Sequence, residues 1–248
     1  MSQEAWIVVG ASSSVAREFA RVCAKEGHHI IAAGRDLEDL ERTAGELELL
    51  GSSRARAVLF DATKYDEHAL FVEKCKSEFA GHTINLFVCF GSMIDQRDCE
   101  EDLTHLRTMT ETNFLGVASL LESFAAPLQH QGAGHVVVLG SVAGDRGRRS
   151  NYHYGATKAA LHTYLQGYRA RMFKYGVHVM TVKPGFLDTA MTWGLPGLFL
   201  VESPVKFARK VMSGARKGPD TLYLPWFWFV IMTIIRFIPE RFFKKMNI

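Results

Sequence analysis

The chain has 248 residues, 48% of them hydrophobic, and a formal net charge of +3. This length predicts one α/β domain around a single core, and so small a net charge argues against nucleic acid as a partner. Four cysteines without a CxxC pair, and ten histidines without ligand-like grouping, predict reduced thiols and no metal site. The N-terminus lacks the basic and long apolar stretches of a signal peptide, so we expect a cytoplasmic protein.

Short apolar runs alternate with helix-length segments along the chain. The runs predict seven strands: AWIVV, HIIAA, ARAVLF, NLFVCF, HVVVLG, HVMTVKP and TLYLP. Helices are predicted over Val15–Lys25, Leu37–Leu50, Leu103–Gln129, Tyr154–Tyr175 and Pro204–Lys217. This order predicts an α/β fold of the Rossmann type, a doubly wound parallel sheet of about seven strands with helices on both faces. We expect residues 1–225 to form this domain and residues 226–248 to form a separate tail.

Ligands of such folds lie beyond the carboxyl ends of the strands, so the residues after each strand are the candidate binding residues. The segment GASSSVA follows the first strand and predicts a turn into a helix N-terminus, which favours a pyrophosphate. Gly10 is present, whereas Ser14 and Ala16 stand where a fuller motif has glycine. The alternative is a simple small-residue turn. The cofactor candidates in this segment are Gly10, Ser12, Ser13, Ser14 and Val15.

The second and third strands end in residues that suit an adenosine. In AAGRD, Gly34 leaves space and Arg35 offers a cation where an acid would repel a 2′-phosphate, so NADPH is favoured over NADH. The alternative is that Arg35 is a solvated residue at the head of a charged helix. In FDA, Asp61 beside Ala62 is placed to accept a hydrogen bond from the adenine, or else to cap the next helix.

Tyr154 and Lys158 are spaced to lie on one face of a helix. A fixed ammonium stabilises a phenolate, so we expect Lys158 to lower the pKa of Tyr154 and make it an acid-base catalyst. Ser141 follows the fifth strand and is placed to meet a substrate carbonyl. Singly, each of these features is common in proteins, and a serine after a strand is often a cap.

Together, Gly10, Asn113, Ser141, Tyr154, Lys158 and the segment KPGFLDT resemble the short-chain dehydrogenase/reductase family over about the first 220 residues. The resemblance implies hydride transfer between a nicotinamide and a carbonyl carbon. It implies that Tyr154 exchanges the proton, Lys158 tunes Tyr154 and holds the nicotinamide ribose, Ser141 polarises the carbonyl and Asn113 positions a relay water. It further implies cofactor contacts at Gly91, Pro184, Gly185, Leu187 and Thr189, and a homo-oligomer.

Three arginines, Arg146, Arg148 and Arg149, lie between the serine strand and the tyrosine helix. Guanidinium groups there are suited to a substrate phosphate, and a solvated loop or an oligomer salt bridge is the alternative. With the apolar segment Gly194–Pro204 as a substrate lid and an apolar tail, they suggest a long lipid that carries a phosphate near the carbonyl.

Within the family, SVAGDRGRRSNYHYGATKA and RFIPERFFKK look like the decaprenylphosphoryl 2-keto-ribose reductases. That resemblance implies reduction of a 2-keto-pentose linked to a polyprenyl phosphate, after a flavin-dependent oxidase partner. A reductase of 3-keto acyl or keto-sphingoid lipids is one alternative. A membrane-surface interaction protein with incidental reductase activity is another, and absence of NADPH binding would support it.

The tail predicts two helices. Residues 226–238 are apolar around almost the whole circumference, but the apolar run is too short to span a bilayer. Pro239 suits the start of a second helix, with Arg241, Lys244 and Lys245 on one face and Phe242, Phe243 and Met246 on the other. We expect the tail to dock on the inner face of a membrane, with packing against a partner subunit as the alternative.

Overall fold

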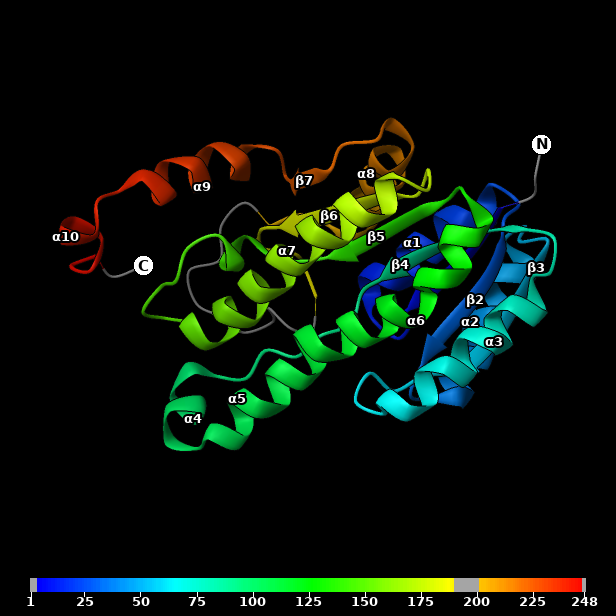
Figure 1. Cartoon of the computed structure of the whole chain (residues 1–248), viewed down its shortest axis with the longest axis horizontal. Helices are drawn as coiled ribbons and strands as arrows, with labels where there is room; N and C mark the ends of the chain where they lie inside the picture. Colours follow the sequence, from blue (N-terminus) through cyan, green and yellow to red (C-terminus); the bar gives the residue numbers. More distant parts are fainter. Residues whose placement is uncertain (1–3, 190–200, 247–248) are drawn as a thin grey trace.

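Seven parallel strands form the centre of the computed structural model, which describes residues 4–189 and 201–246 (Figure 1). Their order across the sheet is β3-β2-β1-β4-β5-β6-β7. The strands are β1 Glu4–Val9, β2 His29–Gly34, β3 Arg54–Leu59, β4 Thr83–Val88, β5 His135–Leu139, β6 His178–Pro184 and β7 Thr221–Leu224. The predicted doubly wound sheet is confirmed, and each strand lies within two residues of its predicted run.

The apolar runs form strands because both faces of the sheet are covered. All residues of β1 from Ala5 to Val9 are buried, which is the pattern of a central parallel strand. Val9 pairs with Ala33 of β2 on one side and with Val88 of β4 on the other, so the carboxyl ends of three strands lie level. The strand order reverses between β1 and β4, which opens a crevice at that edge.

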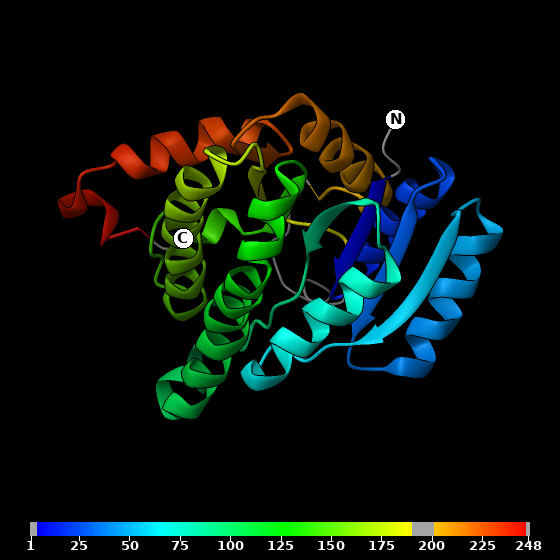
Figure 2. The ribbon, with the colours of Figure 1, turned by 45° about the vertical axis from the view of Figure 1, so that its right-hand side comes forward.

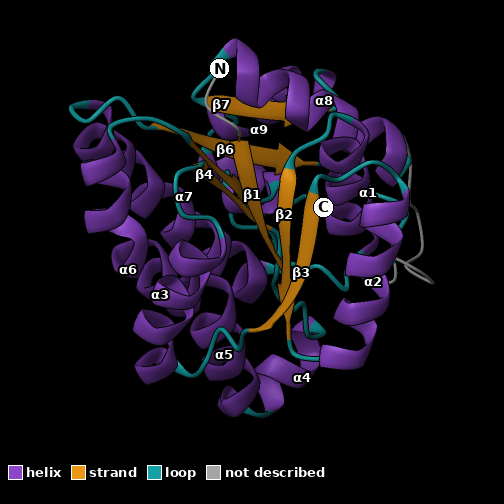
Figure 3. Cartoon of the chain, turned by 90° about the vertical axis from the view of Figure 1, so that its right-hand side faces the viewer, coloured by secondary structure: helices purple, strands orange, loops and turns teal. Residues whose placement is uncertain are grey.

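Helices cover the two faces in two groups (Figure 3). On one face, Trp6, Phe19 and Phe207 belong to a core cluster made by α1, α2 and α8. On the other, Phe71, Phe124 and Leu161 belong to a cluster made by α3, α6 and α7. The helices are α1 Ser14–Lys25, α2 Leu37–Leu49, α3 His68–Glu78, α4 Gln96–Glu101, α5 Leu103–Thr110, α6 Gly116–Gln131, α7 Tyr152–Phe173 and α8 Pro204–Lys217.

One predicted helix is interrupted. The segment Leu103–Gln129, expected to be a single helix, consists of α5, a π-helical turn at Glu111–Leu115 and α6. Gly116 follows the π turn at a point of close approach, because a Cβ there would lie 2.5 Å from the carbonyl oxygen of Ala62. A wider turn lets the helix meet the end of β3 at this place, and such turns are frequent at functional sites.

The tail forms α9, Phe227–Phe237, and α10, Glu240–Phe243, after β7 at the sheet edge (Figures 1 and 2). α9 is apolar around most of its circumference, as predicted, but it is not separate from the domain, because Trp228 and Met232 are buried against it. Among the described residues, no helix is both long and apolar enough to cross a bilayer. The predicted lid falls outside the described residues from 194 to 200.

Candidate active site

A cavity of about 1010 Å³ lies at the carboxyl ends of the central strands. All the residues predicted to bind the cofactor contribute to its wall, and so does Ser141. The predicted residues that line it are Gly10, Ser12, Ser13, Ser14, Val15, Arg35, Asp61, Ala62, Gly91, Ser141, Arg148, Tyr154, Lys158, Pro184, Gly185, Leu187 and Thr189. The described lining residues do not include Asn113, Arg146 or Arg149.

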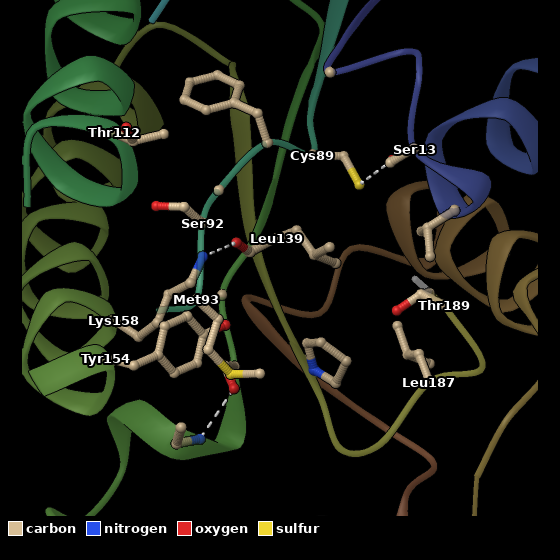
Figure 4. Close-up of a pocket in the computed structure, with 18 of the residues that line it drawn as sticks. Ser13, Cys89, Ser92, Met93, Thr112, Leu139, Tyr154, Lys158, Leu187 and Thr189 are labelled. Atoms are coloured by element: carbon tan, nitrogen blue, oxygen red, sulfur yellow. Dashed lines mark hydrogen bonds between the residues drawn. The ribbon is translucent and has the colours of Figure 1, made fainter. Parts of the chain in front are cut away.

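Tyr154 and Lys158 reach the cavity from the first turns of α7 (Figure 4). The Lys158 Nζ atom lies 5.8 Å from the centre of the Tyr154 ring and donates a hydrogen bond of 3.3 Å to the carbonyl oxygen of Leu139. Both side chains are buried. Burial lowers the pKa of Lys158 to about 8, because an ammonium is poorly solvated there, while nearby Cys89 acts in the opposite direction.

The prediction that Lys158 lowers the pKa of Tyr154 is wrong for this state of the protein. Burial raises the pKa of Tyr154 to about 12, and a hydrogen bond with Ser141 acts in the opposite direction without offsetting it. The reason is that a phenolate enclosed by Met109, Ala143 and the helix loses more hydration than its neighbours restore. Tyr154 is therefore protonated at neutral pH, which is the form that donates a proton.

Ser141 is fixed by hydrogen bonds at two of its atoms. Its Oγ accepts from the backbone N–H of Ala143 at 3.1 Å, and its backbone N–H donates to Nε2 of His162 at 3.4 Å. Because Oγ accepts from the backbone, the hydroxyl hydrogen is directed to the cavity side, where it bonds with the Tyr154 oxygen. A substrate carbonyl beside Tyr154 would receive that hydrogen bond.

Asn113 lies behind the cavity wall. It is fully buried in the π turn, where Oδ1 accepts from the Ser92 N–H at 2.8 Å. Its Nδ2 donates to the carbonyl of Ser92 at 2.8 Å and to Oγ1 of Thr157 at 3.1 Å. Gly91 permits this approach, since a Cβ there would lie 2.9 Å from Oδ1. In this arrangement the Asn113 side chain holds the end of β4 against α7, and the predicted relay water stays a prediction.

The turn after β1 fits a dinucleotide. Gly10 has φ +86°, and a Cβ there would lie 2.5 Å from the carbonyl oxygen of Cys89, so the close approach requires glycine. Ser13 caps α1 by accepting from the Ala16 N–H at 3.2 Å. The exposed Ser12 and Ser14 lie at the helix N-terminus, where backbone N–H groups and the helix dipole favour phosphate. The residues present therefore fit the pyrophosphate of a nicotinamide cofactor.

The adenosine end of the cavity is made by β2 and β3. Arg35 is exposed beside Gly34, and both line the cavity. Asp61 accepts hydrogen bonds from the backbone and hydroxyl of Thr63 at 3.0 and 2.8 Å. These bonds, together with the charge of Arg35, lower the pKa of Asp61, so its carboxylate is ionised.

Comparison with known families decides what the site belongs to. The model for short chain dehydrogenases matches residues 4–196, which include the turn after β1, Ser141, Tyr154 and Lys158. The chain belongs to the short chain dehydrogenase family. It is therefore an oxidoreductase whose family uses NAD(P)H.

Relatives of this short-chain dehydrogenase are similar over nearly its whole length. An uncharacterized oxidoreductase in the mprA 5′ region of Streptomyces coelicolor is 33% identical over 97% of this chain and 94% of its own. An uncharacterized oxidoreductase of Mycobacterium tuberculosis is 29% identical over 97% and 96%. The structure of an alcohol dehydrogenase from Thermococcus sibiricus has the same fold, with a TM-score of 0.79 at 23% identity over 89% of this chain and 95% of that one.

The three arginines of this short-chain dehydrogenase lie in different surroundings. Arg148 lines the cavity, and its buried Nε has no hydrogen-bond partner among the described residues. Arg146 points to the tail, where it donates to the Arg236 carbonyl at 2.9 Å and to Glu240 at 2.7 Å and lies over the Phe243 ring. Arg149 is exposed. The structure therefore does not bring Arg146 and Arg149 to the cavity.

Several lining residues were not foreseen. Trp228 of α9 forms part of the wall, and a Cβ on Gly185 would lie 1.9 Å from its Nε1. Met93, Thr112 and Phe186 line the cavity as well. No local sequence pattern marks these residues. Trp228 in particular reaches the site only because the tail, which was predicted to be separate, folds against the domain.

Proposed function

We propose that this protein is an NADPH-dependent reductase of a 2-keto sugar linked to a polyprenyl phosphate. The observation that carries the proposal is the presence, in one cavity, of the Tyr154 and Ser141 hydroxyls and of Arg148, whose buried Nε has no hydrogen-bond partner among the described residues. The hydroxyls suit a carbonyl, and the guanidinium suits a phosphate on the same molecule.

The positions of these residues assign each of them one step of the proposed reduction. A bound nicotinamide would supply a hydride to the carbonyl carbon. Ser141 donates its hydroxyl hydrogen to the carbonyl oxygen in place of the Tyr154 oxygen, and Tyr154 gives the carbonyl oxygen its proton as the alcohol forms. The ammonium of Lys158 stabilises the phenolate left on Tyr154, which water then reprotonates. The carbonyl gains one hydride and one proton in total.

Arg148 is the residue that favours a phosphorylated substrate. Burial lowers the pKa of Arg148 below its ordinary value, since its charge is poorly hydrated, although the group stays ionised at neutral pH. An anion in the cavity would provide the missing acceptor for its Nε and offset the lost hydration. A 3-keto acyl lipid without a phosphate beside the carbonyl offers neither.

The substrate proposal is tested by NADPH consumption with three lipids. These are a polyprenyl-phosphate-linked 2-keto pentose, its dephosphorylated form and a 3-keto acyl lipid. We expect kcat/KM to be highest for the first. Turnover of the acyl lipid alone would overturn the sugar assignment and leave the reductase activity standing.

Removal of the Arg148 guanidinium tests the phosphate contact. Arg148→Ala is expected to raise KM about tenfold or more for the phosphorylated sugar, since a charge-assisted hydrogen bond contributes about 1.5–3 kcal/mol. A small neutral ketone should be reduced as before. Arg149→Ala is the matched control, because Arg149 is exposed outside the cavity lining. Equal losses on both substrates would mean that the substitution damages the loop.

Arg35 is the proposed reader of the NADPH 2′-phosphate. Arg35→Asp is expected to weaken NADPH binding by about tenfold to hundredfold, because a charged contact is replaced by repulsion, while NADH binding changes little. Cofactor fluorescence titration measures both. Arg42→Asp is the control, since Arg42 is an exposed arginine on α2, paired with Glu38, that does not line the cavity. Equal weakening of NADH and NADPH would refute this role.

We also propose that the tail docks on an anionic membrane surface. The outward side of α9 is an apolar stripe: Trp226 is 73% exposed, Ile234 61% and Phe237 82%. Residues 226–248 hold four of the 29 Lys and Arg and one of the 26 Asp and Glu. Their charge of +3 thus equals that of the whole chain, and the remainder is neutral. Apolar side chains beside cations suit acyl chains beneath anionic headgroups.

Liposome flotation tests this docking. The double change Lys244→Glu and Lys245→Glu is expected to reduce flotation with anionic vesicles, since each cation contributes about 1 kcal/mol. The size of this reduction should depend on the salt concentration. Lys25→Glu with Lys217→Glu makes the same charge change at exposed positions outside the tail and should float as the wild type does. These variants spare Trp228, whose removal by truncation would open the cavity wall. A wild-type protein that never floats would overturn the proposal.

A further inference from the structure

A buried carboxylate, Asp145, joins two strands to the loop that carries Ser141. Its Oδ1 accepts a hydrogen bond of 2.5 Å from Nζ of Lys183 in β6, and its Oδ2 accepts one of 2.7 Å from the Tyr223 hydroxyl in β7. The Asp145 side chain is only 3% exposed. A carboxylate so deeply buried is stable only with such partners, so its position is closely determined.

His162 lies between Asp145 and Ser141. It is one helical turn after Lys158 in α7, and its Nε2 accepts from the Ser141 N–H at 3.4 Å. Its Nδ1 lies 3.6 Å from Oδ1 of Asp145 and has no hydrogen-bond partner among the described residues. Burial, followed by the charges of Lys183 and Lys158, lowers the pKa of His162 to about 2. The ring is therefore neutral, and acceptance at Nε2 places its hydrogen on Nδ1, facing the carboxylate.

The serine loop is shaped around this ring. A Cβ on Gly140 would lie 2.4 Å from Nε2 of His162, and a Cβ on Gly144 would lie 2.7 Å from its Cε1. Both glycines thus let the backbone on either side of Ser141 approach the imidazole. The loop has little freedom to shift while the ring is in place.

We propose that His162, whose Nδ1 faces Asp145 across 3.6 Å, is a positioning residue that fixes the backbone of Ser141 and thereby places its hydroxyl beside the substrate carbonyl. The backbone N–H of Ser141 is held by His162, and its Oγ accepts from Ala143, so the position of the hydroxyl oxygen beside Tyr154 is fixed. The inference rests on the proposed carbonyl reduction and is independent of which carbonyl lipid is the substrate. It gives the network of Asp145, Lys183 and Tyr223 a purpose beyond stability.

The test compares His162→Leu with His162→Gln, each alone and together with Ser141→Ala. Leucine keeps the bulk and removes the acceptor, whereas glutamine keeps an acceptor near the place of Nε2. We expect His162→Leu to lower kcat about tenfold at unchanged KM and NADPH affinity, and His162→Gln to recover most of that loss. In the Ser141→Ala protein, His162→Leu should change kcat less than twofold, because its target is gone.

The outcomes separate this inference from the proposed function. If the wild type reduces no carbonyl substrate with NADPH, the proposed function fails. If the wild type is active and His162→Leu lowers kcat equally with and without Ser141, the residue is merely structural and the inference is overturned. An unchanged kcat overturns it as well. Should His162→Leu not fold, Asp145→Asn takes its place in the same cycle, with the same dependence on Ser141 expected.

Discussion

The variant Tyr154→Phe is expected to lower carbonyl reduction by ~10²-fold or more, as the loss of a general acid does. The ring packs against Met109 and Ala143, and phenylalanine retains that packing. Only the proton donor disappears. Because the pKa of Tyr154 is raised to about 12, the wild-type phenol is protonated at pH 7. Phenylalanine has no hydroxyl that could supply this proton.

Two measurements accompany this result. NADPH affinity and Tm should stay near the wild-type values, which shows that the loss is chemical. Tyr152→Phe is the matched control two residues away, since the Tyr152 hydroxyl is bound to Glu100 on the surface. Full turnover by Tyr154→Phe would remove Tyr154 from the mechanism.

Lys158→Met is expected to reduce kcat/KM by a comparable factor, about 10²-fold, because the ammonium acts on the developing phenolate inside a buried site, where charges interact more strongly than in water. Methionine has nearly the length of lysine and leaves the helix face filled. The hydrogen bond from Nζ to the carbonyl of Leu139 is lost as well, so a decrease in Tm of a few degrees is expected beside the kinetic effect.

The same residue predicts a pH profile. The pKa of Lys158 is lowered to about 8 from 10.5, so the ammonium is present below pH 8 and is lost as the pH rises through that value. Reduction by the wild type should therefore have a constant kcat/KM on the acid side and decline above about pH 8, since kcat/KM reports the free enzyme. The residual activity of Lys158→Met should lack this decline. An identical alkaline decline in that variant would assign it to another group.

The sheet was predictable from sequence because its strands are buried on both faces. Runs such as AWIVV contain no polar residue that would suggest another structure. Continuous apolar runs of this kind are typical of parallel strands that are covered by helices on both faces. The interruption after Thr110 was not predictable. Apolar residues continue at helical spacing through Glu111–Leu115, and the π turn arises from the close packing of Gly116 on Ala62, which is a tertiary contact.

The site was predictable where function depends on sequence-local spacing. Tyr154, Lys158 and the turn around Gly10 are of this kind, and they line one cavity as expected. The pKa of Tyr154 was not predictable from the sequence, because its value depends on burial by Met109 and Ala143, which come from other parts of the chain. An oxidase partner and a homo-oligomer stay predictions.

The arginine loop shows a second limit. The spacing of Arg146 and Arg148 is the same in an extended strand or a loop and gives no direction to their side chains. In the structure Arg146 is engaged by Glu240 and Phe243, ninety residues and more further along the chain. Which arginine binds the tail and which lines the cavity, Arg146 or Arg148, is therefore decided only by the folded tail.

The π turn restricts the length of the chain as well as its composition. Its five residues fill a stretch in which a regular α-helix places about one residue fewer, so the turn behaves as a single-residue insertion. Removing Phe114 or Leu115 would restore a regular helix and rotate the preceding residues by about 100°. Asn113 would then turn away from Ser92 as long as Gly116 kept its place on Ala62. In this stretch a deletion is more damaging than most substitutions, because residue number sets the direction of Asn113.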